Sequence, residues 1–302
     1  MTTSDTTTST QGPRPVTASS TALSGRLDAP EAPSLDLHGE RTPVGTLLKE
    51  IWSRRALLVL LVRKDFHIRY RRASFGMLWA VALPLLQSVV LAVVFSKVVR
   101  AHLVVHYPAF VLMGMAPWTY FGGALSAGAT GIVDQSQMSS RVYFPRAILA
   151  LVGVGSNLYA FFITLVIVIA ITPLLGVGLG LSLLFVFPAT LLLVAFSTAI
   201  CLTLSALHVY FRDVRYAVTA ALLVWLYVTP VIYPPSAVPH VLRVLLAINP
   251  LTGIVSLFHQ ATVGSSGPLL VPAIISAAWT VALLFAGTVL QARYDRVFAD
   301  LL

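Results

Sequence analysis

The chain has 302 residues, of which 57% are hydrophobic and only 10% are charged, and its mean hydropathy is +0.87. This composition excludes a soluble domain, which has no means of burying so much apolar surface. The net charge of +9 would suit a nucleic-acid partner if the basic residues formed a patch, but they flank apolar stretches instead. The single cysteine, Cys201, lies within an apolar run and excludes a disulfide framework or a cysteine-based metal site. We therefore predict a membrane protein that binds neither nucleic acid nor a metal ion.

Residues 1–45 differ in composition from the rest of the chain. Eight of the first ten residues are Ser or Thr, and five prolines follow before residue 46. Such a segment buries too little apolar surface to offset the entropy lost on ordering. It also lacks the apolar centre of a signal peptide, so we expect the first membrane span to act as the targeting signal. We predict a disordered cytoplasmic arm over 1–45 and a single membrane domain over 46–302.

The first predicted element is an amphipathic helix over 46–72. Polar residues such as Lys49 and Lys64 lie on one face. The apolar residues on the opposite face are Leu47, Leu48, Ile51, Trp52, Val59, Val62 and Phe66. The uninterrupted apolar run over 56–62 is far shorter than the roughly 20 residues that cross a bilayer. We expect this helix to lie in the membrane interface. A simple juxtamembrane anchor is the alternative.

The spans that follow are long and apolar enough to cross a bilayer. We therefore predict an all-α membrane protein with six transmembrane helices. Their expected ranges are 77–99, 108–128, 148–171, 181–207, 214–232 and 269–290.

The distribution of charge predicts the orientation of these spans. With the N-terminus inside, 17 of the 20 Lys and Arg residues are cytoplasmic, and only Lys97, Arg100 and Arg243 are outside. Both termini are then cytoplasmic. No Asp or Glu lies deep in a span, so the chain offers no carboxylate for ion coupling. It also lacks the G-x-x-x-x-G-K-[ST] phosphate loop, so any ATP must be hydrolysed by another polypeptide.

Residues 234–266, between the fifth and sixth spans, contain two apolar pieces that meet at Asn249–Pro250. Each piece is too short to cross the bilayer. We predict a re-entrant hairpin of two short helices, because helices satisfy their own backbone groups at membrane depth. A plain surface loop is the alternative.

Four groups of residues now carry a family resemblance. They are RYRRASFGMLW (69–79), VYFPR (142–146), FRDVR (211–215), and TPVIYP (229–234) with INPL (248–251). In this order and spacing they resemble the ABC-2 polysaccharide-export permeases, which include the Wzm-type O-antigen and galactan exporters and the TagG-type teichoic-acid exporters. The likeness runs from about Leu47 to the C-terminus.

The resemblance implies a permease homodimer in the bacterial inner membrane, paired with two copies of a separate nucleotide-binding subunit that binds ATP and Mg. It implies no catalytic residue and no cofactor in this chain. The helix over 46–72 would lie beside the ATPase, and the loop over 132–146 would be the coupling element, with an ordinary solvated turn as the alternative. Arg212 and Asp213 are either a second docking contact or a local pair that ends the fourth span. The candidate coupling residues are Asp134, Gln135, Arg141, Arg212 and Asp213.

A glycan route needs aromatic faces for sugar stacking and few fixed charges. Trp79 and Trp118 also lie near span ends, where interfacial belts collect aromatic residues. The candidate channel residues are Trp79, Trp118, Tyr120, Trp225, Tyr227 and Tyr233. A basic group before the first span is suited to gather the diphosphate of a polyprenyl-linked glycan, although anchoring by the positive-inside rule explains the same residues. This group comprises Arg63, Lys64, Arg69, Arg71 and Arg72.

The function that these features favour is export of an undecaprenyl- or decaprenyl-linked polysaccharide. The Arg-rich and Ala/Val-rich composition favours an actinobacterial lipid-linked galactan, with O-antigen or teichoic acid as alternatives. An ABC-2 exporter of a drug or small lipid is the main competing hypothesis. A membrane-embedded glycosyl- or acyltransferase would need an acid/base cluster, and outside the spans the chain has only His102, His106 and His240, with no acid beside them.

Overall fold

The computed structural model describes residue 2 and residues 44–70, 78–95, 104–135, 144–264 and 269–294. The chain divides into two units, 1–39 and 40–302, and every described residue except residue 2 belongs to the second. The predicted disordered arm therefore lies almost entirely outside the described residues.

The described part of the chain is almost entirely helical and contains no strand, which confirms the predicted all-α class. Short 3-10 helices span Thr172–Leu175, Leu181–Phe185 and Pro235–Ala237. The α-helices are α1 (Val44–Ser53), α2 (Arg55–Tyr70), α3 (Leu78–Val93), α4 (Tyr107–Asp134), α6 (Ala147–Ile171), α7 (Val186–Tyr210), α8 (Val214–Val228), α9 (His240–Ile248), α10 (Pro250–Thr262) and α11 (Leu270–Tyr294).

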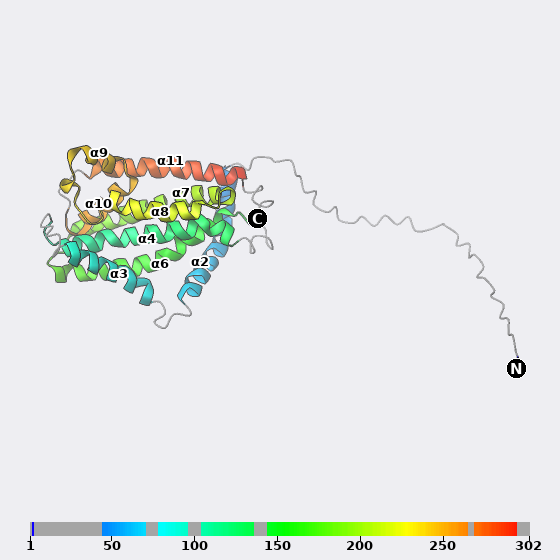
Figure 1. Ribbon diagram of the computed structural model, residues 1–302, viewed down its shortest axis with the longest axis horizontal. Coiled ribbons are helices and arrows are strands. Elements are labelled where there is room, and N and C mark those ends of the chain that lie inside the picture. Colours follow the sequence, from blue (N-terminus) through cyan, green and yellow to red (C-terminus); the bar gives the residue numbers. More distant parts are fainter. Residues whose placement is uncertain are drawn as a thin grey trace. The chain divides into compact units, whose positions relative to one another are not determined.

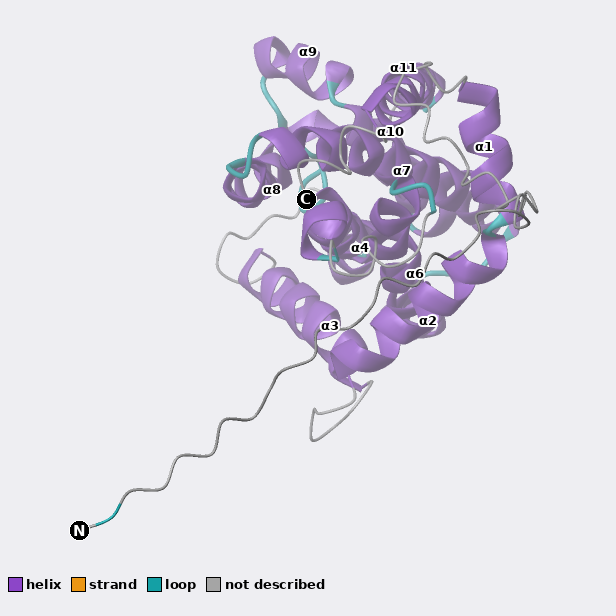
Figure 2. Cartoon of the chain, turned by 90° about the vertical axis from the view of Figure 1, so that its right-hand side faces the viewer, coloured by secondary structure: helices purple, strands orange, loops and turns teal. Residues whose placement is uncertain are grey.

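Helices α4, α6, α7 and α11 form a bundle in which they lie side by side (Figure 1). Helix α4 packs against both α6 and α7, and α11 packs against α7. Helix α3 lies against α4 and α6, and α8 lies against α4 (Figure 2). Stacked aromatic rings fill the centre, with the ring centroids of Phe121 and Phe196 5.7 Å apart. The core is therefore built between helices that are distant in the sequence.

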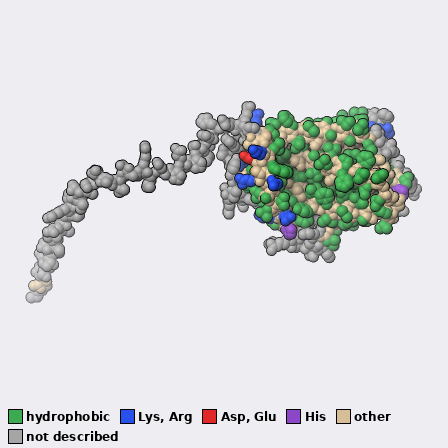
Figure 3. Space-filling model, turned by 180° about the vertical axis from the view of Figure 1, so that it is seen from behind, with side chains coloured by type: hydrophobic (Ala, Val, Ile, Leu, Met, Phe, Trp, Pro, Cys, Tyr) green, Lys and Arg blue, Asp and Glu red, His purple; other side chains and the backbone are tan. Residues whose placement is uncertain are grey.

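Many large apolar side chains lie on the outward surface of the bundle. Phe187, Leu191 and Phe285 are large, apolar and exposed. Apolar side chains cover most of the face in Figure 3, and most of the Lys and Arg side chains on that face lie at one end. Within the described ranges, three helical stretches are long and apolar enough to cross a membrane, namely Ala147–Leu175, Leu181–Tyr210 and Leu270–Arg293. The protein is therefore an integral membrane protein, while the six-span topology and the orientation of the termini stay predictions.

Close contact between α4 and α6 depends on glycine. A Cβ atom on Gly153 would lie 2.5–2.8 Å from backbone atoms of Ala127 and Gly128. Small residues of this kind let membrane helices approach closely. We expect Gly153→Ala to lower the stability of the protein by about 1–3 kcal/mol, because both backbones must shift. Thermal unfolding in detergent measures this, with Gly178→Ala as the control, since nothing lies within 4 Å of a Cβ at Gly178. Equal stability of the two variants would contradict the argument.

The predicted helix over 46–72 is divided into α1 and α2 at Arg54. Helical hydrogen bonding continues through the break, because the Arg54 amide donates to the Glu50 carbonyl oxygen at 3.0 Å. Leu47, Val62 and Phe66 of the predicted apolar face are buried, whereas Leu48, Trp52 and Val59 of the same face are exposed. Helix α2 packs against α6. Whether α1 and α2 lie in the membrane interface stays a prediction.

Helices α9 and α10 meet at Asn249, where the sequence predicts a break. The Asn249 side chain accepts a hydrogen bond from the Leu251 amide at 3.0 Å, and Pro250 occupies the first helical position. Both features are typical of a helix N-terminus. Helix α10 packs against α4, α7 and α11. The two short helices thus exist, and their re-entrant position in a membrane stays a prediction.

Candidate functional site

An ion pair joins two helix ends at the charged end of the bundle. Asp134 is the last residue of α4, and its carboxylate pairs with the guanidinium of Arg215 in the first turn of α8. The two side chains are 47% and 52% exposed. The pair links the start of the predicted coupling loop to α8. Arg215 was not among the predicted coupling residues, although it belongs to the FRDVR motif.

The other predicted coupling residues lie nearby on the chain. Gln135 directly follows α4, and Arg212 and Asp213 are exposed in the turn between α7 and α8. Arg212 and Asp213 form no ion pair with each other in the described part of the chain. Arg141 lies outside the described residues. Their contact with an ATPase therefore stays a prediction.

The end of α2 is fastened to α6 through Arg69. Its guanidinium pairs with Asp65 one turn earlier at 3.0 Å and also donates a 3.0 Å hydrogen bond to the Oδ1 atom of Asn157 on α6. The amide group of Asn157 in turn donates to the Gly153 carbonyl oxygen at 2.7 Å. Asn157 is a polar residue in an apolar helix and was not among the predicted site residues.

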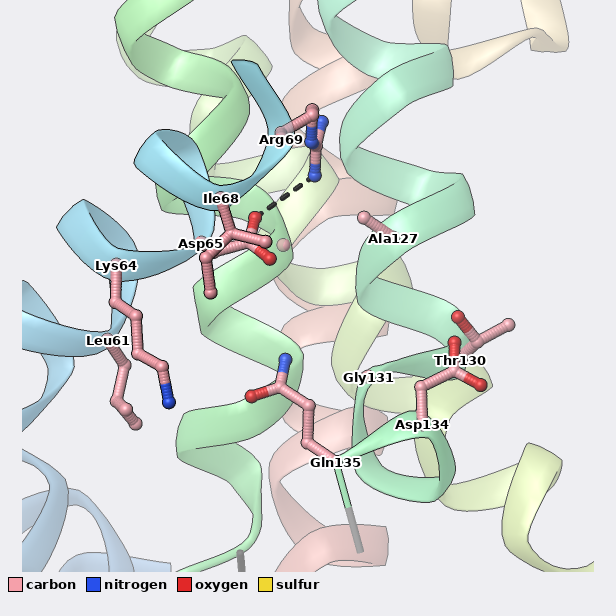
Figure 4. A pocket seen from close by; sticks show the side chains of 11 residues that line it. Leu61, Lys64, Asp65, Ile68, Arg69, Ala127, Thr130, Gly131, Asp134 and Gln135 are labelled. Carbon is pink, nitrogen blue, oxygen red and sulfur yellow. Dashed lines mark hydrogen bonds and ion pairs between the residues drawn. The ribbon is translucent and has the colours of Figure 1, made fainter. Parts of the chain in front are cut away.

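A cavity of about 370 Å³ lies between α2, α4 and α6 (Figure 4). Lys64 and Arg69 of the predicted diphosphate group line it, whereas Arg63 does not. Arg71 and Arg72 lie outside the described residues. The Lys64 side chain extends into the space between α2 and the end of α4 (Figure 4). The structure thus brings two of the five predicted basic residues together with Asp134 and Gln135.

Two of the predicted channel aromatics share a second cavity. This cavity, of about 230 Å³, lies between α3, α4 and α6, and Trp79 and Tyr120 both line it. The Trp79 side chain is 40% exposed, whereas Tyr120 is only 3% exposed. Trp79 is therefore the more accessible of the two rings.

The remaining predicted aromatics are dispersed. Trp118 is 8% exposed and packs in the core, and the Trp225 ring meets Phe121 edge to face at 5.3 Å. Tyr227 is 67% exposed, and its carbonyl oxygen accepts a 2.7 Å hydrogen bond from the Tyr233 hydroxyl. Burial raises the pKa of Tyr233 above its usual value, so the hydroxyl stays protonated and able to donate. Which of these rings contacts a cargo stays a prediction.

Asn249 connects the hinge between α9 and α10 to the end of α8. Its Oδ1 atom accepts hydrogen bonds from the Trp225 indole and the Leu251 amide, both at 3.0 Å. Its Nδ2 group donates to the Thr229 hydroxyl at 2.9 Å and to the Val228 carbonyl oxygen at 3.2 Å. The sequence predicted the break at this residue but not its contacts with α8.

The geometry defines a class of protein. A helical bundle with an apolar outer surface, charged side chains gathered at one end and short helices beside the long ones is typical of a helical membrane protein. No group of three or more His, Cys, Asp or Glu side chains within the described ranges is arranged to hold a metal ion.

Comparison with known proteins identifies the family. Residues 56–262 match the family described as ABC-2 type transporter, and because this covers more than half of the chain, the protein belongs to that family. It is 29% identical over 261 residues to the O-antigen export system permease protein RfbA of Myxococcus xanthus, covering 84% of this chain and 98% of that protein. It is 28% identical over 200 residues to a protein of the same name from Klebsiella pneumoniae, covering 66% and 77%. The family resemblance inferred from the motifs is confirmed.

Proposed function

We propose that this protein is the membrane subunit of a transporter that exports a lipid-linked polysaccharide across the inner membrane. The observation that carries the proposal is the match to the M. xanthus O-antigen export permease over 98% of that protein's length. The corridor forms between two copies of the chain, and both termini are cytoplasmic. The acids among the described residues avoid the three long apolar helices, which is compatible with a route for neutral sugars.

Energy comes from two copies of a separate ATPase. The chain contains no phosphate-binding loop, and the family is that of ABC-2 type transporters. The Asp134–Arg215 pair supports a route by which a movement of the ATPase reaches the membrane helices, because it joins the start of the coupling loop to α8. Arg212 and Asp213, exposed beside it, form a second contact with the ATPase. We expect the purified chain to show only background ATP turnover, and addition of its ATPase partner to produce turnover.

The cargo we favour is a galactan on a polyprenyl diphosphate carrier, for which the supporting observation is the composition of the chain. O-antigen and teichoic acid are the alternatives. The exposed rings of Trp79 and Tyr227 offer faces for sugar stacking. Depletion of the protein should trap lipid-linked glycan at the inner face and reduce glycan at the outer face to background. Sugar analysis of the trapped lipid identifies the cargo.

The depletion experiment also separates polysaccharide export from export of a drug or small lipid. Re-expression of the chain should restore surface glycan, and an unrelated inner-membrane protein expressed at the same level serves as the control. Continued arrival of glycan at the outer face in depleted cells would refute the proposal.

A further inference from the structure

Two cavities follow one another along the contact between α4 and α6. The first, of about 370 Å³, is lined by Ala127 on α4 and Gly153 on α6. The second, of about 230 Å³, is lined by Gly123 and Asn157, each about one turn further along the same helices. Arg69, which lines the first cavity, donates its hydrogen bond to Asn157, which lines the second. A ligand that occupies both cavities therefore passes beside this bond.

The first cavity carries charges of both signs in equal number. The charged side chains in its lining are two cations and two carboxylates, namely Lys64, Arg69, Asp65 and Asp134. Lys64 and Asp65 extend from α2 into the space between α2 and α4, and Gln135 extends into it from the end of α4 (Figure 4). The Oδ2 atom of Asp65 accepts from Arg69, but an ionised carboxylate has room for about four hydrogen bonds. A ligand that matches this lining carries one negative and one positive group.

The second cavity is mainly apolar. Trp79, Leu83, Pro84 and Phe161 line it, and none of the described residues in its lining is charged. Its volume lies below the roughly 300–1,000 Å³ of pockets that enclose a drug-sized ligand, so it accommodates part of one hydrocarbon chain. Trp79 and Leu83 are also exposed, so the lining continues onto the apolar surface of the bundle.

We infer that the two cavities bind a resident phospholipid whose zwitterionic head carries a primary ammonium group, the chemistry of phosphatidylethanolamine. The phosphate lies at Lys64, the ammonium lies between Asp65 and Gln135, and one acyl chain enters the second cavity. A primary ammonium has three N–H donors for the carboxylate and amide oxygens, whereas a quaternary ammonium has none. An anionic head would place a second negative charge beside Asp65. The inference goes beyond the proposed export function, because the ligand is a lipid of the bilayer and not the cargo.

Such a lipid would connect two parts of the protein that the first cavity separates. Helix α2 packs against α6, and the cavity lies between α2 and the end of α4. The bound head contacts Lys64 and Asp65 on α2 and Gln135 at the end of α4. It therefore joins the helix predicted to lie beside the ATPase to the start of the predicted coupling loop. A ligand that binds the folded protein in this way also stabilises it.

The test is a binding titration by native mass spectrometry, with the full chain and its ATPase partner in detergent. The probes are the dioleoyl forms of phosphatidylethanolamine, phosphatidylcholine and phosphatidylglycerol, and glycerophosphoethanolamine, which is the head without acyl chains. We expect phosphatidylethanolamine to bind about tenfold more tightly than the other two phospholipids, because only its head donates charge-assisted hydrogen bonds to the carboxylate. Glycerophosphoethanolamine should bind at least about tenfold more weakly than the intact lipid, because it has no chain to bury.

Two variants test the two halves of the head separately. Asp65→Asn should remove the preference for phosphatidylethanolamine over phosphatidylcholine, because it removes the charged acceptor of the ammonium. Lys64→Gln should weaken binding of all three phospholipids, because each carries the phosphate. The matched controls are Glu50→Gln and Arg63→Gln, which remove one charge of each sign from positions outside the lining of the first cavity. Both controls should retain the affinity and the preference of the unaltered protein.

Thermal unfolding gives a second measurement. Phosphatidylethanolamine should raise the Tm of the unaltered protein more than phosphatidylcholine does, and Asp65→Asn should abolish that difference. The Asp65 side chain is 33% exposed, so loss of its ion pair should leave the protein folded. Equal affinities of the unaltered protein for the three phospholipids would overturn the inference, and this result depends on no variant. A preference that survives Asp65→Asn, or that Glu50→Gln also abolishes, would overturn it as well.

Discussion

Replacing Asp134 with Arg is expected to reduce ATP-driven export by about tenfold in the reconstituted complex, within the range of coupling free energies between protein sites. Asp134 ends α4 where the coupling loop begins, and its partner Arg215 lies in the first turn of α8. Val218 is the one buried residue of α8, and the other contacts of this helix with the core come from half-buried side chains such as Leu222 and Trp225. Two like charges at this position would push the start of α8 away from α4.

The same change should leave the protein folded. Both partners are about half exposed, and exposed ion pairs contribute about 0–1 kcal/mol to stability. Thermal unfolding in detergent should therefore remain close to that of the unaltered chain. The matched control is the swapped pair, Asp134→Arg with Arg215→Asp, which restores the attraction and should recover much of the export per ATP hydrolysed. A swapped variant as inactive as Asp134→Arg alone would show that the two residues act separately.

Local signals in the sequence were sufficient to predict the short helices. Asn249–Pro250 predicted a break, and α9 and α10 meet there because Pro250 lacks an N–H and Asn249 caps the following helix. The amphipathic pattern of the first helix is followed in part, because Leu47, Val62 and Phe66 are buried and Leu48, Trp52 and Val59 on the same face are exposed. Both features depend on residues within a few positions of each other in the chain.

Features set by distant residues could not be predicted in this way. Arg215 meets Asp134 across 81 positions, and Arg69 meets Asn157 across 88. Helix α4 continues to residue 134, beyond the expected end at 128, because Ile132 packs in the interior. Hydropathy does not mark the buried face of a helix that is apolar on all sides.

The candidate aromatics illustrate this limit. Trp118 and Tyr227 have equally suitable rings by composition, yet one is buried in the core and the other is largely exposed. The predicted diphosphate-binding residues also differ in position. Lys64 lines the cavity between α2, α4 and α6, and the adjacent Arg63 does not. Residue type and spacing identify the basic residues before the first span. The packing of α2 against α6 determines which of them line the cavity.

Asn249→Ala is expected to lower stability by about 2–4 kcal/mol and to abolish export. The change removes an acceptor from the Trp225 indole and the Leu251 amide, and each buried donor left without a partner costs about 1–3 kcal/mol. It also releases the α9–α10 hinge from Thr229 at the end of α8. Unfolding in detergent and export in reconstituted vesicles measure the two effects.

Two milder variants decide whether Asn249 acts through α8. Trp225→Phe retains an aromatic ring but removes the indole donor, and Thr229→Val removes one acceptor, so each should cost about 1 kcal/mol. Because the Trp225 bond is already lost in Asn249→Ala, adding Trp225→Phe should produce less than the sum of the single effects. Ser236→Ala, at an exposed position before α9, should change neither stability nor export. Strictly additive losses would mean that the hinge and α8 are energetically independent, and the proposed connection through Asn249 would then be wrong.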